Sequence, residues 1–196
     1  MPISEEGLHH PKPFIFSHSG QKIGPGYQAP SVEDIAVSLG RICRFAGHGL
    51  KFWSVLLHSF VVQDLVCEEA KGIAILHDAS ETVFSDIPTP FKEDKTRLME
   101  ADLLNTIFRE HLSNKHYKSY HLNPDIWKMV KIADTEAFLG EVGVIGTKAL
   151  RSLYPERSVK AEKLVRKYLK KYSVLDTVSN EGIAVIDFIR RVKDYQ

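Results

Sequence analysis

The residue types best suited to chemistry are a neighbouring imidazole and carboxylate, His77-Asp78, followed within one helical turn by Glu81. They close an apolar run, residues 72–76, which predicts the end of a core-facing helix. Polar groups that are buried without a partner are costly, so something must bind them there. A divalent metal ion is the simplest such partner.

Two further side chains could complete a metal site, His58 upstream and Asp134 downstream, each in an apolar segment. Two imidazoles and two carboxylates suit Mn, Co, Fe, Ni or Zn. Four protein ligands leave an octahedral ion with open positions, as in a catalytic site, where the ion polarises a phosphoryl group. Glu81 would orient the attacking water, because its spacing places it on the helical face of His77 and Asp78. Alone, His77-Asp78 could instead be a hydrogen-bonded pair at a helix end.

The composition narrows the class of protein. The 196 residues carry 26 basic and 25 acidic side chains, a net charge of +1, so we expect no stable nucleic-acid partner. A hydrophobic content of 43% and a charged content of 26% are those of a soluble globular protein with a substantial core. No apolar stretch is long enough to cross a bilayer, so we expect no membrane partner.

The expected compartment is the cytoplasm. Cys43 and Cys67 lie in apolar segments without CxxC spacing, which predicts reduced core residues rather than a disulfide or a zinc site. The first residues have neither a basic start nor an apolar run, so no signal peptide is expected.

Helical periodicity dominates from Ser31 onward. Residues 1–30 predict an N-terminal arm with a short β-hairpin, and residues 31–196 predict a single helical domain. The first helix is expected to begin at the Ser31 cap and to close with Arg44 and Phe45 before a Gly-rich break. The fold class is therefore all-α with a short N-terminal β-element. The remaining expected elements are about Ser54–Val66, Glu68–Val83, Lys92–Leu112, a polar loop Ser113–Asn123, a helix opened by Asn123-Pro124, Ser158–Tyr172 and Glu181–Tyr195.

The set His58, His77-Asp78 and Asp134 resembles the metal ligands of the HD-domain metal-dependent phosphohydrolases. Residues 77–81 followed by 86–92 are similar to the bacterial 5′-deoxynucleotidases and to the small phage triphosphohydrolases that remove dATP and other dNTPs. The resemblance covers roughly residues 31–140. It implies an HD-domain helical bundle, a divalent transition metal, a small-molecule deoxynucleotide as partner, and a homo-oligomer (dimer or hexamer). For a phage-encoded protein the compartment would be the host cytoplasm.

The resemblance also implies roles for four residues around the ligands. Arg44 would approach the substrate phosphates, and Phe45 would lie against the nucleoside. Asp86 would lie by the scissile phosphate or the sugar and help with proton transfer, and Lys92 would contact phosphate. Each has a structural alternative: a helix-terminal cation for Arg44, a core aromatic for Phe45, a turn residue for Asp86 and a surface lysine for Lys92.

The expected reaction is hydrolysis at the α-phosphate of a deoxynucleotide. Extra cations near the motif favour a triphosphate substrate, namely Lys51, Lys92, Lys95 and Arg97. Hydrolysis of such a substrate would release the deoxynucleoside and triphosphate. The phage resemblance makes dATP the first base to consider. A 5′-deoxynucleotidase acting on dNMPs is the close alternative. A non-catalytic nucleotide-binding HD sensor is the alternative of another class, against which the intact ligand set argues. A signalling-nucleotide phosphodiesterase is a further, less favoured alternative.

Overall fold

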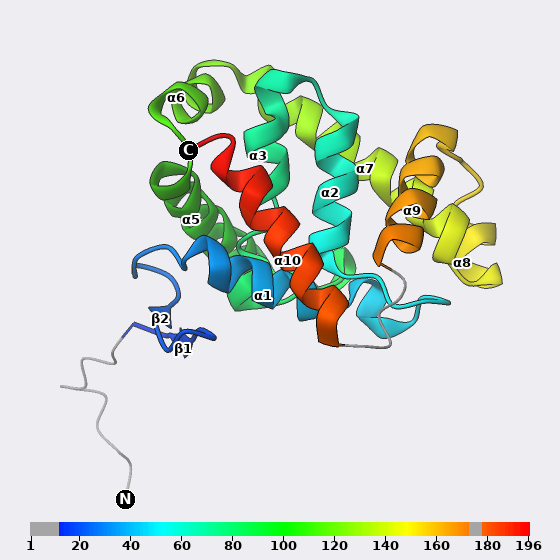
Figure 1. Cartoon of the computed structure of the whole chain (residues 1–196), viewed down its shortest axis with the longest axis horizontal. Helices are drawn as coiled ribbons and strands as arrows, with labels where there is room; N and C mark the ends of the chain where they lie inside the picture. The colour runs from blue at the N-terminus through cyan, green and yellow to red at the C-terminus, as the bar shows by residue number, and fades with distance from the viewer. Residues whose placement is uncertain (1–11, 173–177) are drawn as a thin grey trace, which may run out of the picture.

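The computed structural model describes residues 12–172 and 178–196, and its regular structure there is helical apart from one hairpin (Figure 1). The hairpin pairs β1 (Ile15–Phe16) with β2 (Lys22–Ile23) in antiparallel register, Ile15 opposite Ile23. The predicted all-α fold with a short N-terminal β-hairpin is therefore confirmed. Residues 1–11 of the expected arm lie outside the described residues.

The helices that follow the hairpin differ widely in length. In chain order they are α1 (Val32–Arg41), η1 (Arg44–Gly47), α2 (Val55–Leu65), η2 (Glu68–Ala70), α3 (Lys71–Leu76), α4 (Glu81–Phe84), η3 (Thr89–Phe91), α5 (Asp94–His111), α6 (Asn114–Leu122), α7 (Pro124–Ile145), α8 (Lys148–Leu153), α9 (Val159–Tyr172) and α10 (Val178–Lys193), where η denotes a 3₁₀ helix.

One carboxylate fixes the hairpin to the helical body. Ser31 caps α1, its hydroxyl accepting the backbone N–H of Asp34 at 3.0 Å. The buried Asp34 carboxylate in turn accepts the hydroxyls of Ser17 and Ser19 at 2.9 and 2.7 Å, and the Ser19 backbone N–H at 2.9 Å. The first turn of α1 therefore anchors the loop between the two strands.

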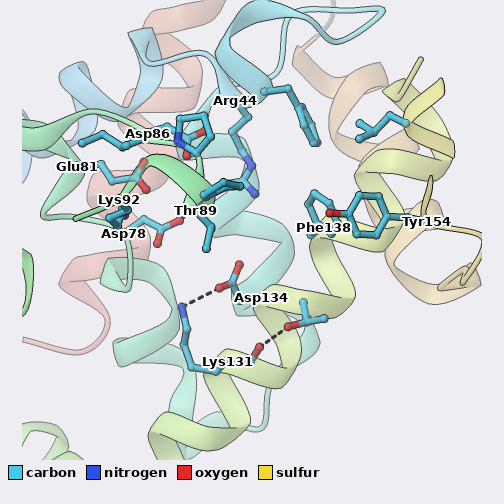
Figure 2. A pocket seen from close by; sticks show the side chains of 16 residues that line it. Arg44, Asp78, Glu81, Asp86, Thr89, Lys92, Lys131, Asp134, Phe138 and Tyr154 are labelled. Atoms are coloured by element: carbon cyan, nitrogen blue, oxygen red, sulfur yellow. Dashed lines mark hydrogen bonds and ion pairs between the residues drawn. The ribbon is translucent and has the colours of Figure 1, made fainter. Parts of the chain in front are cut away.

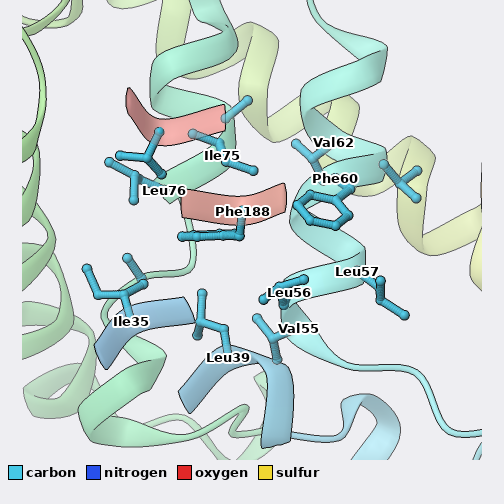
Figure 3. Close-up of a cluster of buried hydrophobic side chains, with 14 of the residues drawn as sticks. Ile35, Leu39, Val55, Leu56, Leu57, Phe60, Val62, Ile75, Leu76 and Phe188 are labelled. Carbon is cyan, nitrogen blue, oxygen red and sulfur yellow. The ribbon is translucent and has the colours of Figure 1, made fainter. Parts of the chain in front are cut away.

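The core surrounds α2, whose residues 55–63 are all buried. A helix that is apolar on every side must be enclosed by other helices, and α2 packs against α1, α3, α7, α9 and α10. Figure 3 shows Phe188 of α10 reaching between Phe60 of α2 and the apolar residues Ile75 and Leu76 of α3. The helix α2 carries His58, and α3 ends directly before His77 and Asp78. This packing therefore fixes the position of the predicted metal ligands.

Two helix boundaries near the site differ from the sequence prediction. The first helix ends at Arg41, because Ile42 is extended and the Arg44 backbone N–H pairs with the Trp53 carbonyl at 2.9 Å. The expected helix Glu68–Val83 is interrupted: η2 and α3 end at Leu76, and α4 begins at Glu81. Between them, hydrogen bonds join residues three apart, so 77–80 form turns rather than a continuous α-helix.

Other differences lie away from the site. The expected polar loop Ser113–Asn123 contains α6, which is held by ring contacts such as Tyr120 to Phe108 at 5.1 Å between centroids. The short helix α8 was not predicted, whereas the boundaries of α2, α5, α9 and the start of α7 were predicted to within two residues. The cysteines are free, but the core prediction was wrong, because Cys43 is half-buried and Cys67 is exposed.

Candidate metal centre and pocket

Three separate elements bring the predicted ligands together. His58 lies in the middle of α2, His77 and Asp78 lie in the turn after α3, and Asp134 lies in α7. The His58 Nε2 atom is 3.1 Å from an Asp134 oxygen and 3.6 Å from an Asp78 oxygen. The His77 Nε2 atom is 3.1 Å from Asp78 and 3.9 Å from Asp134. Both nitrogens therefore face the same two carboxylates.

The outer nitrogen of each imidazole is already occupied. Nδ1 of His77 donates to the Ala74 carbonyl at 2.8 Å, and Nδ1 of His58 lies 2.7 Å from the Glu141 carboxylate. In the neutral ring, which keeps its proton on Nδ1, the lone pair of each Nε2 is directed at the centre of the cluster, where a metal ion would take the place of a second proton. The Nε2 atom of His77 is buried and has no hydrogen-bond partner among the described residues. This orphaned lone pair is the donor that a metal ion requires.

The charges of the cluster also favour a cation. Burial would raise the pKa of Asp78 and Asp134, but the histidines beside them hold both pKa values well below the ordinary range. Burial and the charge of Arg44 would lower the pKa of His58, yet Glu141 and Asp134 outweigh them and raise it to about 9. Because the His58 imidazole retains its second proton so strongly, the space between it and the aspartates is suited to a positive charge. The residues present thus fit a divalent ion. One potential ligand atom from each of His58, His77 and Asp78 lies within 4.8 Å of the other two.

A pocket of about 540 Å³ opens beside the cluster, within the range of small-molecule sites. Figure 2 shows Asp78, Glu81 and Asp86 on one side, and Phe138 and Tyr154 on the other. The remaining lining residues are Arg44, Phe45, Ile87, Pro88, Thr89, Pro90, Lys92, Lys131, Asp134, Thr135 and Leu150.

Two carboxyl groups of the pocket have raised pKa values. Burial, with the charges of Asp78 and Asp86, raises the pKa of Glu81 well above its usual value. The Glu81 side chain is buried, and its Oε2 atom has no partner among the described residues. Burial also raises the pKa of Asp86, against the lowering effect of Arg44. A raised pKa suits a carboxyl that exchanges a proton during turnover.

Three cations line the pocket, and each is paired with a carboxylate. Arg44 donates from Nε to Glu141 at 3.0 Å. Lys92 Nζ lies 2.9 Å from Glu100. Lys131 Nζ lies 2.8 Å from Asp134, the pair drawn as a dashed line in Figure 2. Pairing holds these side chains at the pocket wall.

The extra cations expected near the phosphates are placed differently. Lys51, Lys95 and Arg97 are not among the pocket-lining residues in the described part of the chain. Arg97 instead donates to the Thr89 carbonyl at 3.2 Å. The structure therefore removes the charge argument that these three residues gave for a triphosphate.

Aromatic rings form the wall opposite the carboxylates. Phe45 lies 6.0 Å from Phe138, and Phe138 lies 4.9 Å from Tyr154, between ring centroids. Phe45 and Ala46 both adopt left-handed backbone conformations, with φ of 58° and 49°. Such conformations are unfavourable for residues with a side chain and cluster at functional sites. The turn 44–47 thus places a guanidinium and an aromatic ring on adjacent parts of the pocket.

Sequence reasoning missed Lys131, Phe138, Glu141 and Tyr154. Three of them lie in α7, at spacings of −3, +4 and +7 from Asp134. These are the spacings of one helical face, so the signal was present once Asp134 was taken as a ligand. Tyr154 follows α8, a helix that was not predicted, and nothing in its local sequence marks it.

Comparisons with known proteins place the fold. No protein-family model matches the chain. The Escherichia coli (strain K12) protein YfdR, described as uncharacterized, is 40% identical over 106 residues, 53% of this chain and 54% of YfdR. The chain therefore matches only about half the length of that relative.

A solved structure has a similar fold. It is the cyanophage S-2L HD phosphohydrolase DatZ, bound to dA and one catalytic Zn²⁺ ion, with a TM-score of 0.50 and 16% identity over 86% of this chain and 99% of that one. The chain thus has the fold of an HD phosphohydrolase, as its motif predicted. Among the described residues, no helix combines the length and apolar character needed to span a membrane.

Proposed function

We propose that this protein is a metal-dependent phosphohydrolase that cleaves the 5′-phosphate ester of a deoxynucleotide. The observation that carries the proposal is the convergence of His58, His77, Asp78 and Asp134 at the edge of a pocket that also presents cations and aromatic rings. DatZ, which shares the fold, is bound to dA and one catalytic Zn²⁺ ion.

The proposed ion would be held by the two Nε2 atoms and the two aspartates. When bound, a divalent ion of this kind supplies Lewis acidity toward a phosphoryl oxygen and toward water. The metals that suit this mixed set are Mn, Co, Fe, Ni and Zn.

The chain's own residues would do the rest of the chemistry. The free ends of the Arg44 guanidinium, together with Lys92 and Lys131, would hold the phosphate oxygens and spread their charge. Glu81 would orient the attacking water and take its proton. Asp86 would deliver a proton toward the departing 5′ oxygen, for which its raised pKa is suited. Phe45, Phe138 and Tyr154 would receive the nucleoside.

The substrate we favour is a deoxynucleoside triphosphate, with dATP tested first. The support is that three lining cations, Arg44, Lys92 and Lys131, would offer one contact to each of three phosphate groups. A 5′-deoxynucleotidase is the second candidate, because each lining cation is already paired with a carboxylate and Lys51, Lys95 and Arg97 lie outside the lining.

Product analysis separates these candidates. The purified protein is incubated with each dNTP, dNMP and NTP in the presence of Mn²⁺ or Co²⁺, and the products are resolved by ion-exchange chromatography. Deoxynucleoside with triphosphate is the result expected for the favoured reaction. Orthophosphate released only from dNMPs would replace it with the deoxynucleotidase. No product from any nucleotide, from protein shown to bind metal, would leave the non-catalytic sensor and end the proposal.

A further inference from the structure

One carboxylate outside the pocket, that of Glu141, contacts both a proposed metal ligand, His58, and a proposed phosphate-binding residue, Arg44. Glu141 lies on α7, two helical turns after Asp134, and its side chain is fully buried. It is not among the pocket-lining residues, so it would touch neither substrate nor metal. A buried carboxylate is expensive unless it is fully paired, and Glu141 is paired on both oxygens.

Each oxygen of Glu141 has a defined task. Oε1 accepts the indole N–H of Trp53 at 2.8 Å and lies 2.7 Å from Nδ1 of His58. Oε2 accepts Nε–H of Arg44 at 3.0 Å. All three of these partners present an N–H group, so the Glu141 carboxylate only accepts hydrogen bonds.

These contacts decide which atoms the partners present to the pocket. Because Glu141 accepts from Nδ1, the His58 ring is fixed with Nε2 toward the aspartates. Because Glu141 occupies Nε of Arg44, the two terminal nitrogens of the guanidinium stay available, with one of them 3.9 Å from Asp78. A guanidinium held this way can bind phosphate through two parallel hydrogen bonds.

We propose that Glu141 is a positioning residue that holds a metal-ligating histidine and a phosphate-binding arginine in their working orientations at once. The inference rests on the proposed function, since it assumes a metal at His58 and a phosphate at Arg44. It adds a residue that acts through His58 and Arg44 and would contact neither the metal ion nor the phosphate.

The variant Glu141→Gln separates this role from packing, because it keeps the shape and changes the donors. If the amide oxygen continues to accept from Trp53 and His58, the amide N–H₂ must face Nε–H of Arg44, donor against donor. If the amide is reversed, its N–H₂ faces the indole N–H of Trp53 and Nδ1 of His58 instead. In either orientation at least one partner is released, and loss of the negative charge weakens the hydrogen bonds that remain.

Two binding measurements without turnover test the inference. Titration calorimetry with Mn²⁺ on metal-free protein should show a Kd raised about 10- to 100-fold in Glu141→Gln, the usual effect of losing an outer contact to a ligand. Binding of inorganic phosphate to the metal-free protein should weaken about tenfold. Glu136→Gln is the matched control: it lies on the same helix, bonds Ser158 at 2.7 Å and should change neither constant.

A double-variant comparison makes the test specific. In an Arg44→Gln background, Glu141→Gln should no longer affect phosphate binding, but it should still weaken Mn²⁺ binding. Folded Glu141→Gln protein with both constants unchanged would overturn the inference, as would an equal loss of phosphate binding in the two backgrounds. If the Gln variant loses its helical circular dichroism, Glu141→Asp is measured instead, since the shorter side chain retreats from both partners. Normal constants there would also overturn the inference.

The outcomes also separate this inference from the function itself. A wild-type protein that hydrolyses no nucleotide contradicts the proposed function, yet the Mn²⁺ and phosphate constants still report on Glu141. Conversely, an active enzyme with normal binding in the Glu141→Gln variant contradicts only the positioning role.

Discussion

At the scale of single residues, the site depends on which nitrogen of each histidine is left free. The Ala74 carbonyl and the Glu141 carboxylate occupy the Nδ1 atoms, so both Nε2 lone pairs turn inward. The spacing of His77 and Asp78 predicted a metal pair, but these outer partners come from other parts of the chain. Glu141 shares a helical face with Asp134, but its role was missed because its partners Arg44 and His58 lie far away in the sequence.

Asp78 and Glu81 should separate metal binding from turnover. We expect Asp78→Ala to lose both the bound metal and the activity, because it removes a carboxylate that faces both imidazoles. Glu81→Ala should keep the metal and lower kcat by about 10²- to 10⁴-fold, the range for loss of a general acid or base. Metal content by mass spectrometry and steady-state kinetics check the two effects. Equal loss of metal in both variants would refute this division of roles.

At the scale of elements, the sequence predicted the helices better than their interruptions. Apolar periodicity continues through residues 68–83, so one helix was expected where η2, α3, a turn and α4 follow one another. The turn is set by tertiary contacts, because it carries two side chains that face partners on α2 and α7. The left-handed turn at Phe45 and Ala46 was also not predicted, because neither position carries the glycine that usually indicates such a backbone conformation.

Close packing of α7 on α9 depends on Gly140. A Cβ atom there would lie 2.5 Å from Cβ of Ala161, so Gly140→Ala should destabilise the protein by about 1–3 kcal/mol despite the better helix former. Gly182 on α10 is the matched control, because within the described residues no atom would meet its added Cβ. Gly182→Ala should gain up to about 1 kcal/mol. Urea unfolding measures both, and equal effects at the two sites would contradict this packing.

Asp64 ties the C-terminal helices to the central one, and it makes stability depend on pH. It accepts Tyr168 Oη at 2.5 Å, Lys167 Nζ at 3.2 Å and Arg191 at 3.0 Å, and despite burial these partners lower its pKa. Asp64→Asn should therefore cost about 2 kcal/mol at neutral pH.

The pH dependence of that difference follows from the direction of the shift. A carboxyl with a lowered pKa stabilises the fold above its unfolded value, near 3.8, and loses that contribution as the pH falls through its folded value. The gap in unfolding free energy between wild type and Asp64→Asn should thus be constant from about pH 5 to 7 and shrink below pH 4. A gap independent of pH down to pH 2 would show that the charge plays no part.

At the scale of the whole molecule, the apolar core is what assembles a polar site. The helix α10 crosses α1, α2 and α3 (Figure 1), and α2 packs against both α3 and α7. The ligands are 76 residues apart in the chain, from His58 to Asp134, and meet because these helices enclose one another. The general fold could be predicted from the motif. Tyr154 of the aromatic wall could not, because it follows the unpredicted α8, whereas Phe45 was expected beside the nucleoside. The expected dimer or hexamer stays a prediction.

The central claim is that four side chains hold a single metal ion. The direct measurement is the metal content per chain after loading metal-free protein with Mn²⁺ and removing excess ion by gel filtration. The account predicts about one ion per wild-type chain, and a content near zero in folded His58→Ala, His77→Ala and Asp78→Ala proteins. A wild-type chain without metal, or folded variants that keep the full content, would contradict it.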